Sequence, residues 1–541
     1  MTYALSVRTA DADAGAGTVD QLVTDRVASG IARRDPTLWG ADAEEEAAKR
    51  LSWVDLHNSS RELLQPIETL RDEYRAAGLD RVVLCGMGGS SLAPEVVCAT
   101  AGVELGVLDS SDPTTVRAAL ADRLDRTVVV VSSKSGSTLE TDSQRRAYEH
   151  AFREAGIDPA ERVVVVTDPG SPLDKDARSA GYRVFAADPQ VGGRYSALTA
   201  FGLVPSGLAG ADVGALLDEA ASIAGDLVED SPQNPGLRLG ALLGIAAARG
   251  VDKLVLVDTG SGIAGFGDWA EQLVAESTGK QGTGVLPVVV ESAHAPNADP
   301  STPDAVVVAI GPAGGHPDGD GSAPASGWGA NLDAPLGAQL LLWEYATAVA
   351  GRVLGINPFD QPDVESAKQA ARGLLENPTA APEPGLVDGV VQVRATGGLE
   401  LGEPRDLAGA VATLLAELDP THGYLAVTAY LDRGSDARLE GVRSALAART
   451  GRPTTFGWGP RFLHSTGQYH KGGPATGVYL QVTGDPGDDL DVPGQSFSFG
   501  QFVAAQAAGD AQVLAEHGRP VLRLHLSDRE RGVDQLLEVL R

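Results

Sequence analysis

Hydroxyl groups, glycines and a lysine gather at two points of the chain, each directly after a short apolar run. The first point is Gly86–Ser91 (GMGGSS), which follows Val82–Cys85 and precedes the apolar stretch Leu92–Ala99. The second point is Ser132–Thr138 (SSKSGST), which follows Val128–Val131. Glycines let the backbone approach a ligand closely, and the first free N–H groups of a helix point at negative charge. Both points therefore predict a phosphate-binding turn between a strand and a helix.

Each point also has a plainer explanation. Gly86–Ser91 could simply pack a helix on a strand, because its spacing matches neither the dinucleotide fingerprint nor the P-loop. At the second point, Ser137 and Glu140 could form a capping box at a helix start. A capping box uses one hydroxyl, whereas five occur between Ser132 and Thr138. Phosphate binding is the interpretation that we prefer.

Two further segments carry groups for acid–base chemistry. Arg194 stands between a glycine pair and a predicted helix start in VGGRYS, where its fixed donors suit an oxyanion. Gly267–Lys280 predicts a helix that starts near Asp268 and ends at Gly279. Gln272 and Glu276 share a face of this helix, and Glu276 lies in the last turn, which disfavours negative charge. A general base fits this description, although an ordinary solvated glutamate fits it as well.

The remaining candidates follow later in the chain. Pro358–Lys368 (PFDQPDVESAK) predicts a turn that leads into a helix, with Gln361 near the start of that helix. Gly457–Gly473 predicts a loop rich in glycine and aromatic residues, in which His464 and His470 are both candidates for a functional role. No pair of histidines has metal-ligand spacing with further Cys or His support, so we predict no metal.

These segments need a scaffold that brings strand ends together. Short buried strands separated by helices predict a parallel sheet covered on both faces, with ligands beyond the carboxyl ends of the strands. The strands predicted for a first sheet are Val82–Cys85, Leu105–Leu108, Val128–Val131, Val163–Val166 and Tyr182–Ala186. The strands predicted for a second sheet are Leu254–Val257, Val285–Val289 and Ala305–Ile310.

The rest of the chain is divided by two predicted loops, Gly311–Ala334 and Glu376–Asp388. Later strands either extend the second sheet or form a layer of their own: Tyr424–Tyr430, Val478–Val482 and Val521–Leu526. We expect a mainly helical region over residues 1–66, a first α/β domain over 67–225, and a second over 226–541 that includes a C-terminal α/β extension.

Composition narrows the classes of function. The formal net charge of −30 at pH 7 argues against nucleic acid or an anionic membrane as partner, because both require a basic face. The first residues lack a basic segment followed by an apolar one, and no apolar run approaches ~20 residues. Cys85 and Cys98 fall in a predicted strand and helix, as expected for buried thiols in a reducing compartment. We expect a cytoplasmic protein.

In combination, five motifs resemble the signatures of the glucose-6-phosphate isomerase family. They are GMGGSSLAP, SSKSGSTLET, VGGRYS, QLVAESTGK and NPFDQPDVESAK, in this order over about residues 80–370. The later stretch GPRFLHSTGQYHKGGP resembles the actinobacterial branch and the isomerase part of transaldolase–isomerase fusions. The resemblance implies two sugar-isomerase (SIS) α/β domains with parallel sheets flanked by helices, here with a helical N-terminal region and an α/β C-terminal extension.

The resemblance also implies roles for individual residues. Glu276, beside Gln272, would move the proton between C1 and C2 of the sugar, while Arg194 with Gly193 would stabilise the enediolate. The other implied residues lie near the phosphate or the ring oxygen: Gly89, Ser90, Ser133, Lys134, Ser135, Ser137, Thr141, Gln361 and the catalytic Lys368.

The ring-opening histidine departs from the order usual in the family, where it lies between the catalytic glutamate and the FDQ element. Between Glu276 and Gln361 this chain offers His294 and His316, without the expected context. His464 has a matching HSTGQ context but follows both elements. Either the loop is relocated, or the histidine comes from a neighbouring subunit, since sites of the family are built across a dimer. We predict His464.

The activity implied is reversible isomerisation of glucose 6-phosphate and fructose 6-phosphate through a cis-enediol, in glycolysis and gluconeogenesis. We expect a homodimer that needs no cofactor. One alternative is a bifunctional enzyme that also accepts mannose 6-phosphate. Another is a non-catalytic SIS-domain sensor of sugar phosphates, which would need the phosphate loops but not Glu276, Gln272 or Arg194.

Overall fold

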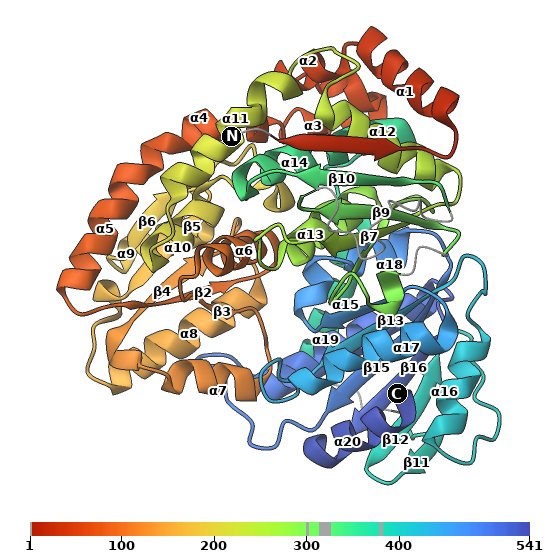
Figure 1. Cartoon of the computed structure of the whole chain (residues 1–541). Helices are drawn as coiled ribbons and strands as arrows, with labels where there is room; N and C mark the ends of the chain where they lie inside the picture. Colours follow the sequence, from red (N-terminus) through yellow and green to blue (C-terminus); the bar gives the residue numbers. More distant parts are fainter. Residues whose placement is uncertain (1–2, 299–301, 313–325, 378–381) are drawn as a thin grey trace.

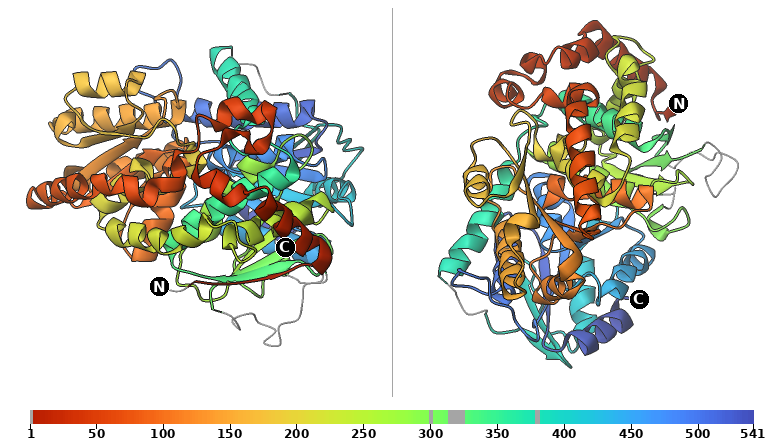
Figure 2. Two further views of the ribbon diagram at one scale, coloured as in Figure 1. Left: turned by 90° about the horizontal axis from the view of Figure 1, so that it is seen from above. Right: turned by 90° about the vertical axis from the view of Figure 1, so that its left-hand side faces the viewer.

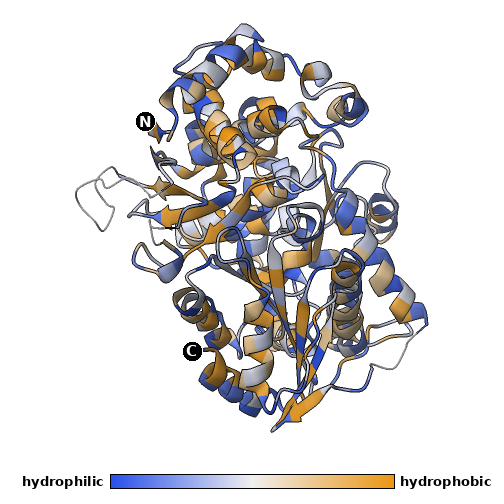
Figure 3. Ribbon diagram, turned by 90° about the vertical axis from the view of Figure 1, so that its right-hand side faces the viewer, coloured by the Kyte–Doolittle hydropathy of each residue, from blue (hydrophilic) through white to orange (hydrophobic). Residues whose placement is uncertain are grey.

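The computed structural model describes residues 3–298, 302–312, 326–377 and 382–541, which form three β-sheets with helices packed around them (Figure 1). The strands are hydrophobic where they lie between helices, and hydrophilic residues gather on the outer faces of the helices (Figure 3). This is the α/β architecture of parallel sheets flanked by helices that the sequence predicts.

The first sheet is wholly parallel, in the order β3-β2-β4-β5-β6. It confirms the five predicted strands, which are Arg81–Gly86 (β2), Gly106–Leu108 (β3), Thr127–Ser132 (β4), Val163–Thr167 (β5) and Arg183–Ala186 (β6). Alternate residues of each strand face two different cores, as the pleat requires. The helices of this unit are Leu64–Ala76 (α5), Leu92–Ala101 (α6), Pro113–Ala121 (α7), Leu139–Glu154 (α8), Pro172–Ser179 (α9) and Ala200–Ala209 (α10).

The two faces of this sheet differ in what covers them. Leu84 and Val130 pack with residues of α6 and α10 in the largest core. Val83 and Val129 pack on the opposite face with Tyr148 of α8. Cys85 belongs to that second core and Cys98 lies in α6, and both are buried free thiols as predicted.

The second sheet has the order β1-β10-β9-β7-β8 and is parallel except for β1. Its strands are Ala4–Arg8 (β1), Lys253–Asp258 (β7), Leu286–Val289 (β8), Ala305–Ile310 (β9) and Gly329–Asp333 (β10). The prediction of a loop over Gly311–Ala334 is wrong for β10, while residues 313–325 lie outside the described residues. The short GANLD segment has no strand pattern of its own and is extended because β9 and β1 pair with its two edges.

The N-terminal helices run over one side of the first and second sheets (Figure 2). They are Ala12–Thr24 (α1), Val27–Ala32 (α2), Ala41–Ala47 (α3) and Leu56–Ser59 (α4). This region is part of the core and not only of the periphery, because Trp39 and Trp53 are buried in the largest core. The helices near the second sheet are Val213–Leu227 (α11), Pro235–Ala248 (α12), Phe266–Thr278 (α13), Leu336–Leu354 (α14) and Pro362–Glu376 (α15).

The last strands form a third sheet, in the order β11-β12-β16-β15-β13-β14, which settles the question that the sequence left open. Its strands are Leu386–Asp388 (β11), Val391–Thr396 (β12), Tyr424–Tyr430 (β13), Thr454–Trp458 (β14), Gly477–Gly484 (β15) and Val521–Leu526 (β16). The loop predicted over Glu376–Asp388 is therefore wrong for β11, which pairs with β12, and residues 378–381 of it lie outside the described residues. The helices of this C-terminal unit are Leu407–Ala416 (α16), Val442–Thr450 (α17), Gly467–Gly472 (α18), Phe499–Glu516 (α19) and Arg529–Leu540 (α20).

The C-terminal unit docks on the second sheet. Tyr424 and Tyr479 from the third sheet share a core with Val255 and Val288 from the second sheet. The opposite face of the third sheet packs with residues of α16, α17 and α20. Helix α15 lies on α19, so the helix that carries Lys368 rests on the C-terminal unit.

Candidate active site

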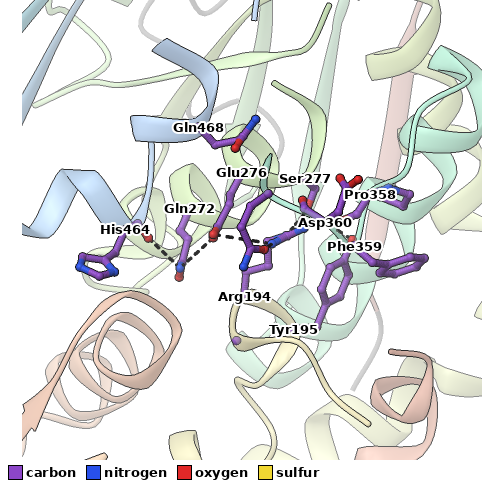
Figure 4. A network of polar contacts seen from close by, with 12 residues as sticks. Arg194, Tyr195, Gln272, Glu276, Ser277, Pro358, Phe359, Asp360, His464 and Gln468 are labelled. Atoms are coloured by element: carbon purple, nitrogen blue, oxygen red, sulfur yellow. Dashed lines mark hydrogen bonds and ion pairs between the residues drawn. The ribbon is translucent and has the colours of Figure 1, made fainter. Parts of the chain in front are cut away.

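Helix α13 places Gln272 and Glu276 on one face, as the four-residue spacing predicts. Gln272 Nε2 donates to Glu276 Oε2 at 3.1 Å and to the backbone oxygen of His464 at 2.8 Å (Figure 4). Gln272 Oε1 is buried and has no partner in the part of the chain that the structure describes. Glu276 is only 8% exposed, so the alternative of an ordinary solvated glutamate is wrong.

Arg194 lies in the short 3-10 turn Gly193–Tyr195 (η7) and joins three segments of the chain. Its Nε donates to Ser277 Oγ at 2.8 Å, and its Nη1 donates to Gln361 Oε1 at 2.5 Å. Its Nη2 donates to the backbone oxygens of Pro358 and Asp360. Nη1 also lies 3.7 Å from Glu276 Oε1 (Figure 4). A buried, permanently charged donor thus stands beside the buried carboxylate, as stabilisation of an oxyanion requires.

The glycine-rich turn lies against these residues. Gly88 and Gly89 belong to the 3-10 turn Gly88–Ser90 (η4), and Gly88 has φ +55°, which favours glycine. A Cβ at Gly88 would lie 2.7 Å from Gln272 Nε2, and one at Gly89 would lie 1.9 Å from the backbone oxygen of Gly193. The glycines therefore let η4, η7 and α13 approach one another.

A cavity of about 300 Å³ opens next to this cluster. The segment between β4 and α8 contributes Ser135 and Ser137, and α15 contributes Lys368. The 3-10 turn Arg461–His464 (η10) contributes His464. The further lining residues are Thr138, Leu139, Glu140, Val364, Glu365, Ala367, Ala371, Arg372, Leu463, Phe502 and Gln506. Glu276 is not among them, and Gln272 connects it to the wall through its bond to the His464 backbone.

His464 is paired with Glu140 across the cavity wall. Its Nε2 lies 3.1 Å from Glu140 Oε1, and Gln506 Nε2 donates to the same oxygen at 2.8 Å. Burial acts to raise the pKa of Glu140, but the hydrogen bond and the charge of His464 hold it below its ordinary value. The capping-box alternative is contradicted, because α8 begins at Leu139 with Thr138 as its N-cap. A carboxylate that accepts from one ring nitrogen fixes the orientation of the imidazole.

Comparison with known proteins connects this geometry to a family. The model of the phosphoglucose isomerase family matches residues 46–293. A probable glucose-6-phosphate isomerase of Haloarcula marismortui is 30% identical over 366 residues, which cover 59% of this chain and 84% of that protein. The chain belongs to the glucose-6-phosphate isomerase family. Sugar-phosphate isomerisation is the reaction class of this family, and the chain is an enzyme of that class.

Solved structures agree on the fold. A hypothetical protein of Thermus thermophilus superposes with a TM-score of 0.58 at 24% identity, covering 69% of this chain and all of that one. A glucose-6-phosphate isomerase of Chlamydia trachomatis gives a TM-score of 0.55 at 21% identity, covering 70% of this chain and 89% of that one. In the described residues, no helix is both long and apolar enough to span a membrane.

The matched segment of the family ends before α15 and the C-terminal unit, which supply Gln361, Lys368 and His464. In the structure, these three side chains reach the surroundings of Glu276 within one copy of the chain. Their arrangement around the cavity is an observation of this structure, and their roles stay predictions.

The predicted phosphate residues divide into three groups. Ser135 and Ser137 line the cavity, with their hydroxyls 2.6 Å apart. Lys134 is turned away, because its Nζ pairs with Asp168 at 2.9 Å and donates to the backbone oxygen of Pro189. The other expected phosphate residues near this loop and the glycine turn are partly or fully buried: Gly89, Ser90, Ser133 and Thr141.

His294 and His470 are not among the residues that line the cavity. His294 is exposed on the chain segment between β8 and the next turn, and His316 lies outside the described residues. His470 is buried, with its Nδ1 3.0 Å from the hydroxyl of Tyr424. The prediction of a loop over Gly457–Gly473 is also corrected, because η10 and α18 form helical turns there.

Several residues that support the site were not singled out from the sequence. Gln468, on α18, donates to the backbone oxygen of Gly279 and to Asp363 Oδ2, and it accepts from the Asp363 N–H. It thus links the end of α13 to the start of α15. Buried Lys280 donates to the backbone oxygens of Asn357 and Asp360 and to the Asp360 carboxylate.

These supporting residues carried different signals. Burial, and then the nearby charge of Arg194, lower the pKa of Lys280 to about 8. Both Lys280 and Glu140 lie inside motifs that the sequence analysis quoted, ESTGK and STLET, and a polar residue beside a predicted site was the available signal. Gln468 and Gln506 carried no such signal, because only the docking of the C-terminal unit brings them to the site.

Proposed function

We propose that this chain interconverts glucose 6-phosphate and fructose 6-phosphate, with Glu276 as the base. The observation that carries the proposal is the buried Glu276 carboxylate, held by Gln272 and 3.7 Å from the Arg194 guanidinium. A sensor of sugar phosphates would need hydroxyls at a loop but no buried carboxylate paired in this way.

In the proposed reaction, the ring opens first. His464 and Lys368, which both line the cavity, move protons at the ring oxygen and at O1, because general acid–base catalysis needs groups within hydrogen-bond reach of both oxygens. The hydroxyls of Ser135 and Ser137 hold the phosphate, and Lys368 adds positive charge there. Glu140 keeps His464 oriented.

The isomerisation follows in the open chain. Glu276 takes the proton from C2 of the aldehyde form, and the electron pair of that C–H bond forms the C1–C2 double bond of a cis-enediolate. Arg194 stabilises the developing oxyanion. After a proton moves between O2 and O1, Glu276 returns its proton to C1 and leaves the C2 ketone. Every proton is restored, so the step consumes no co-reactant.

This interconversion belongs to glycolysis and gluconeogenesis, and we place the chain there. We also propose a cytoplasmic homodimer, for which the support is the family resemblance. The division into residues 1–66, 67–225 and 226–541 is likewise proposed, with the three sheets as its structural basis.

The test is the rate of conversion of fructose 6-phosphate to glucose 6-phosphate by the purified protein, with and without EDTA, beside Glu276→Gln. Loss of the proton-transfer base should lower kcat about 10²–10⁴-fold and leave sugar-phosphate binding largely intact. Glu417→Gln, on an exposed position at the end of α16, is the matched control and should keep full activity.

Two results would contradict the proposal. Tight sugar-phosphate binding without turnover by the unaltered protein would favour the sensor. Full activity of Glu276→Gln would remove the glutamate from the proton transfer.

A further inference from the structure

Arg461 occupies the first position of η10, three residues before His464, and is 9% exposed. Its Nη1 lies 2.5 Å from Asp109 Oδ2, and its Nη2 lies 2.5 Å from Glu95 Oε2. Nη2 also lies 3.5 Å from Asp268 Oδ2. Burial acts to lower the pKa of Arg461, but the charges of Asp109, Glu95 and Asp268 raise it.

The three carboxylates come from elements that build the site. Asp109 directly follows β3 in the first sheet. Glu95 lies in the first turn of α6, just after the glycine-rich turn. Asp268 lies in the first turn of α13, the helix that carries Glu276. Arg461 therefore joins the C-terminal unit to both other units at the point where His464 enters the cavity.

Two weaker contacts complete the attachment of this turn to α13. The backbone oxygen of His464 accepts from Gln272, and Ser465 Oγ donates to Glu271 Oε1 at 3.2 Å. Neither contact reaches the first α/β unit, in which helix α8 carries Glu140, the partner of His464. Besides the bond between His464 and Glu140 itself, the ion pairs of Arg461 with Asp109 and Glu95 attach η10 to the unit that holds Glu140.

We propose that Arg461 is a positioning residue for ring opening. Its forked ion pairs set the position of His464 relative to the ring oxygen of the bound sugar. This inference rests on the proposed function. It predicts that a change at Arg461 slows only those reactions that need His464.

The variant must keep the buried charge. A neutral residue would leave Asp109 and Glu95 without their buried partner, and breaking a buried pair in this way is strongly destabilising. Arg461→Lys keeps the charge but loses the planar fork that binds two carboxylates at once. The control is Arg433→Lys, which alters a second cation on the same Glu95, 2.9 Å from Oε1, on the exposed loop after β13.

The experiment compares two substrates. Fructose 6-phosphate is cyclic, whereas its 5-deoxy analogue lacks the hydroxyl that closes the furanose ring and stays open. Arg461→Lys should lower kcat/KM for fructose 6-phosphate about 10- to 100-fold, as expected for a catalytic group displaced by about 1 Å. Turnover of the open analogue should be unchanged, and Arg433→Lys should alter neither rate. Glu276→Gln should slow both substrates.

A double-mutant cycle gives an independent answer if the analogue is a poor substrate. In a His464→Gln background, Arg461→Lys should cost nothing more, because the residue through which it acts is gone. Equal losses on both substrates, or a full further loss in the His464→Gln background, would overturn the inference and leave the proposed function standing. If the unaltered protein converts neither substrate, it is the proposed function that fails.

Discussion

His464 and His470 lie six residues apart in one glycine-rich stretch, and the pattern of that stretch alone marks both as candidates. The structure separates them. His464 lines the cavity and is bonded there to Glu140. His470 is 3% exposed and is held by Tyr424 and Tyr479 where the second and third sheets meet.

This difference lies in the surroundings of each imidazole. Burial, with smaller contributions from the charges of Lys471 and Arg519, lowers the pKa of His470 to about 3, so this ring stays neutral. His464 has a carboxylate beside one nitrogen and a cavity beside the ring, as proton transfer requires. Two like residues in one short segment thus serve packing and chemistry respectively, because docking of the C-terminal unit buries one and leaves the other open.

The largest expected effect separates the two histidines directly. His464→Gln places an amide near the position of Nε2, so the bond to Glu140 can persist while proton transfer is lost. We expect kcat/KM for fructose 6-phosphate to fall about 10²–10⁴-fold, with thermal stability unchanged. Steady-state kinetics and thermal unfolding measure the two quantities. A variant with near-normal kinetics would assign ring opening to another residue.

Glu140→Gln should have a smaller effect on the same histidine. The neutral amide can still bond to His464, but that hydrogen bond no longer involves a charged carboxylate. A charge-assisted hydrogen bond is stronger than a neutral one by about 1–2 kcal/mol, which corresponds to a loss of roughly tenfold in kcat/KM. In a His464→Gln background the same change should cost nothing further. A full further loss in that background would show that Glu140 does not act through His464.

His470→Asn should change stability and leave activity intact, because Oδ1 of asparagine can take the place of Nδ1 beside Tyr424. The folded-state pKa of about 3 lies below the ordinary value of 6.5, so the unfolded state binds the extra proton between these values. This contribution to stability is complete above pH 6.5 and is lost as the pH falls. Denaturant unfolding should show a loss of about 2 kcal/mol between pH 7 and pH 5 that the variant lacks. An identical pH dependence in both proteins would contradict burial of a neutral His470.

The smallest expected effect is none. Because His464 and Glu276 come from one chain here, mixing the inactive His464→Gln and Glu276→Gln proteins under conditions of subunit exchange should restore no activity. Recovery of part of the unaltered activity would show that the histidine is supplied by a neighbouring subunit. The unaltered protein carried through the same exchange is the control.

Much of the scaffold follows from the sequence alone. Valine-rich runs such as Val163–Val166 predict buried strands of a parallel sheet, and the structure confirms them. The spacing of Gln272 and Glu276 predicts a shared helix face, and Gly279 predicts the end of that helix. These are properties of windows of a few residues, in which periodicity and helix-end preferences act locally.

Other features depend on contacts between distant segments. Strand β10 has no pattern of its own and is extended because β1 and β9 pair with it. The third sheet does not extend the second sheet, because the face that carries Tyr424 and Tyr479 packs against the second sheet. Lys134 is predicted from the sequence as a phosphate ligand, and the fold brings it into an ion pair with Asp168.

The sequence by itself therefore determined the alternation of strands and helices, the glycine turns and the pair on α13. The tertiary structure alone decided that His464 meets Glu140, a residue 324 positions earlier in the chain. The physical reason is that helix and strand preferences act between near neighbours, whereas a hydrogen bond between two units depends on how their apolar faces dock.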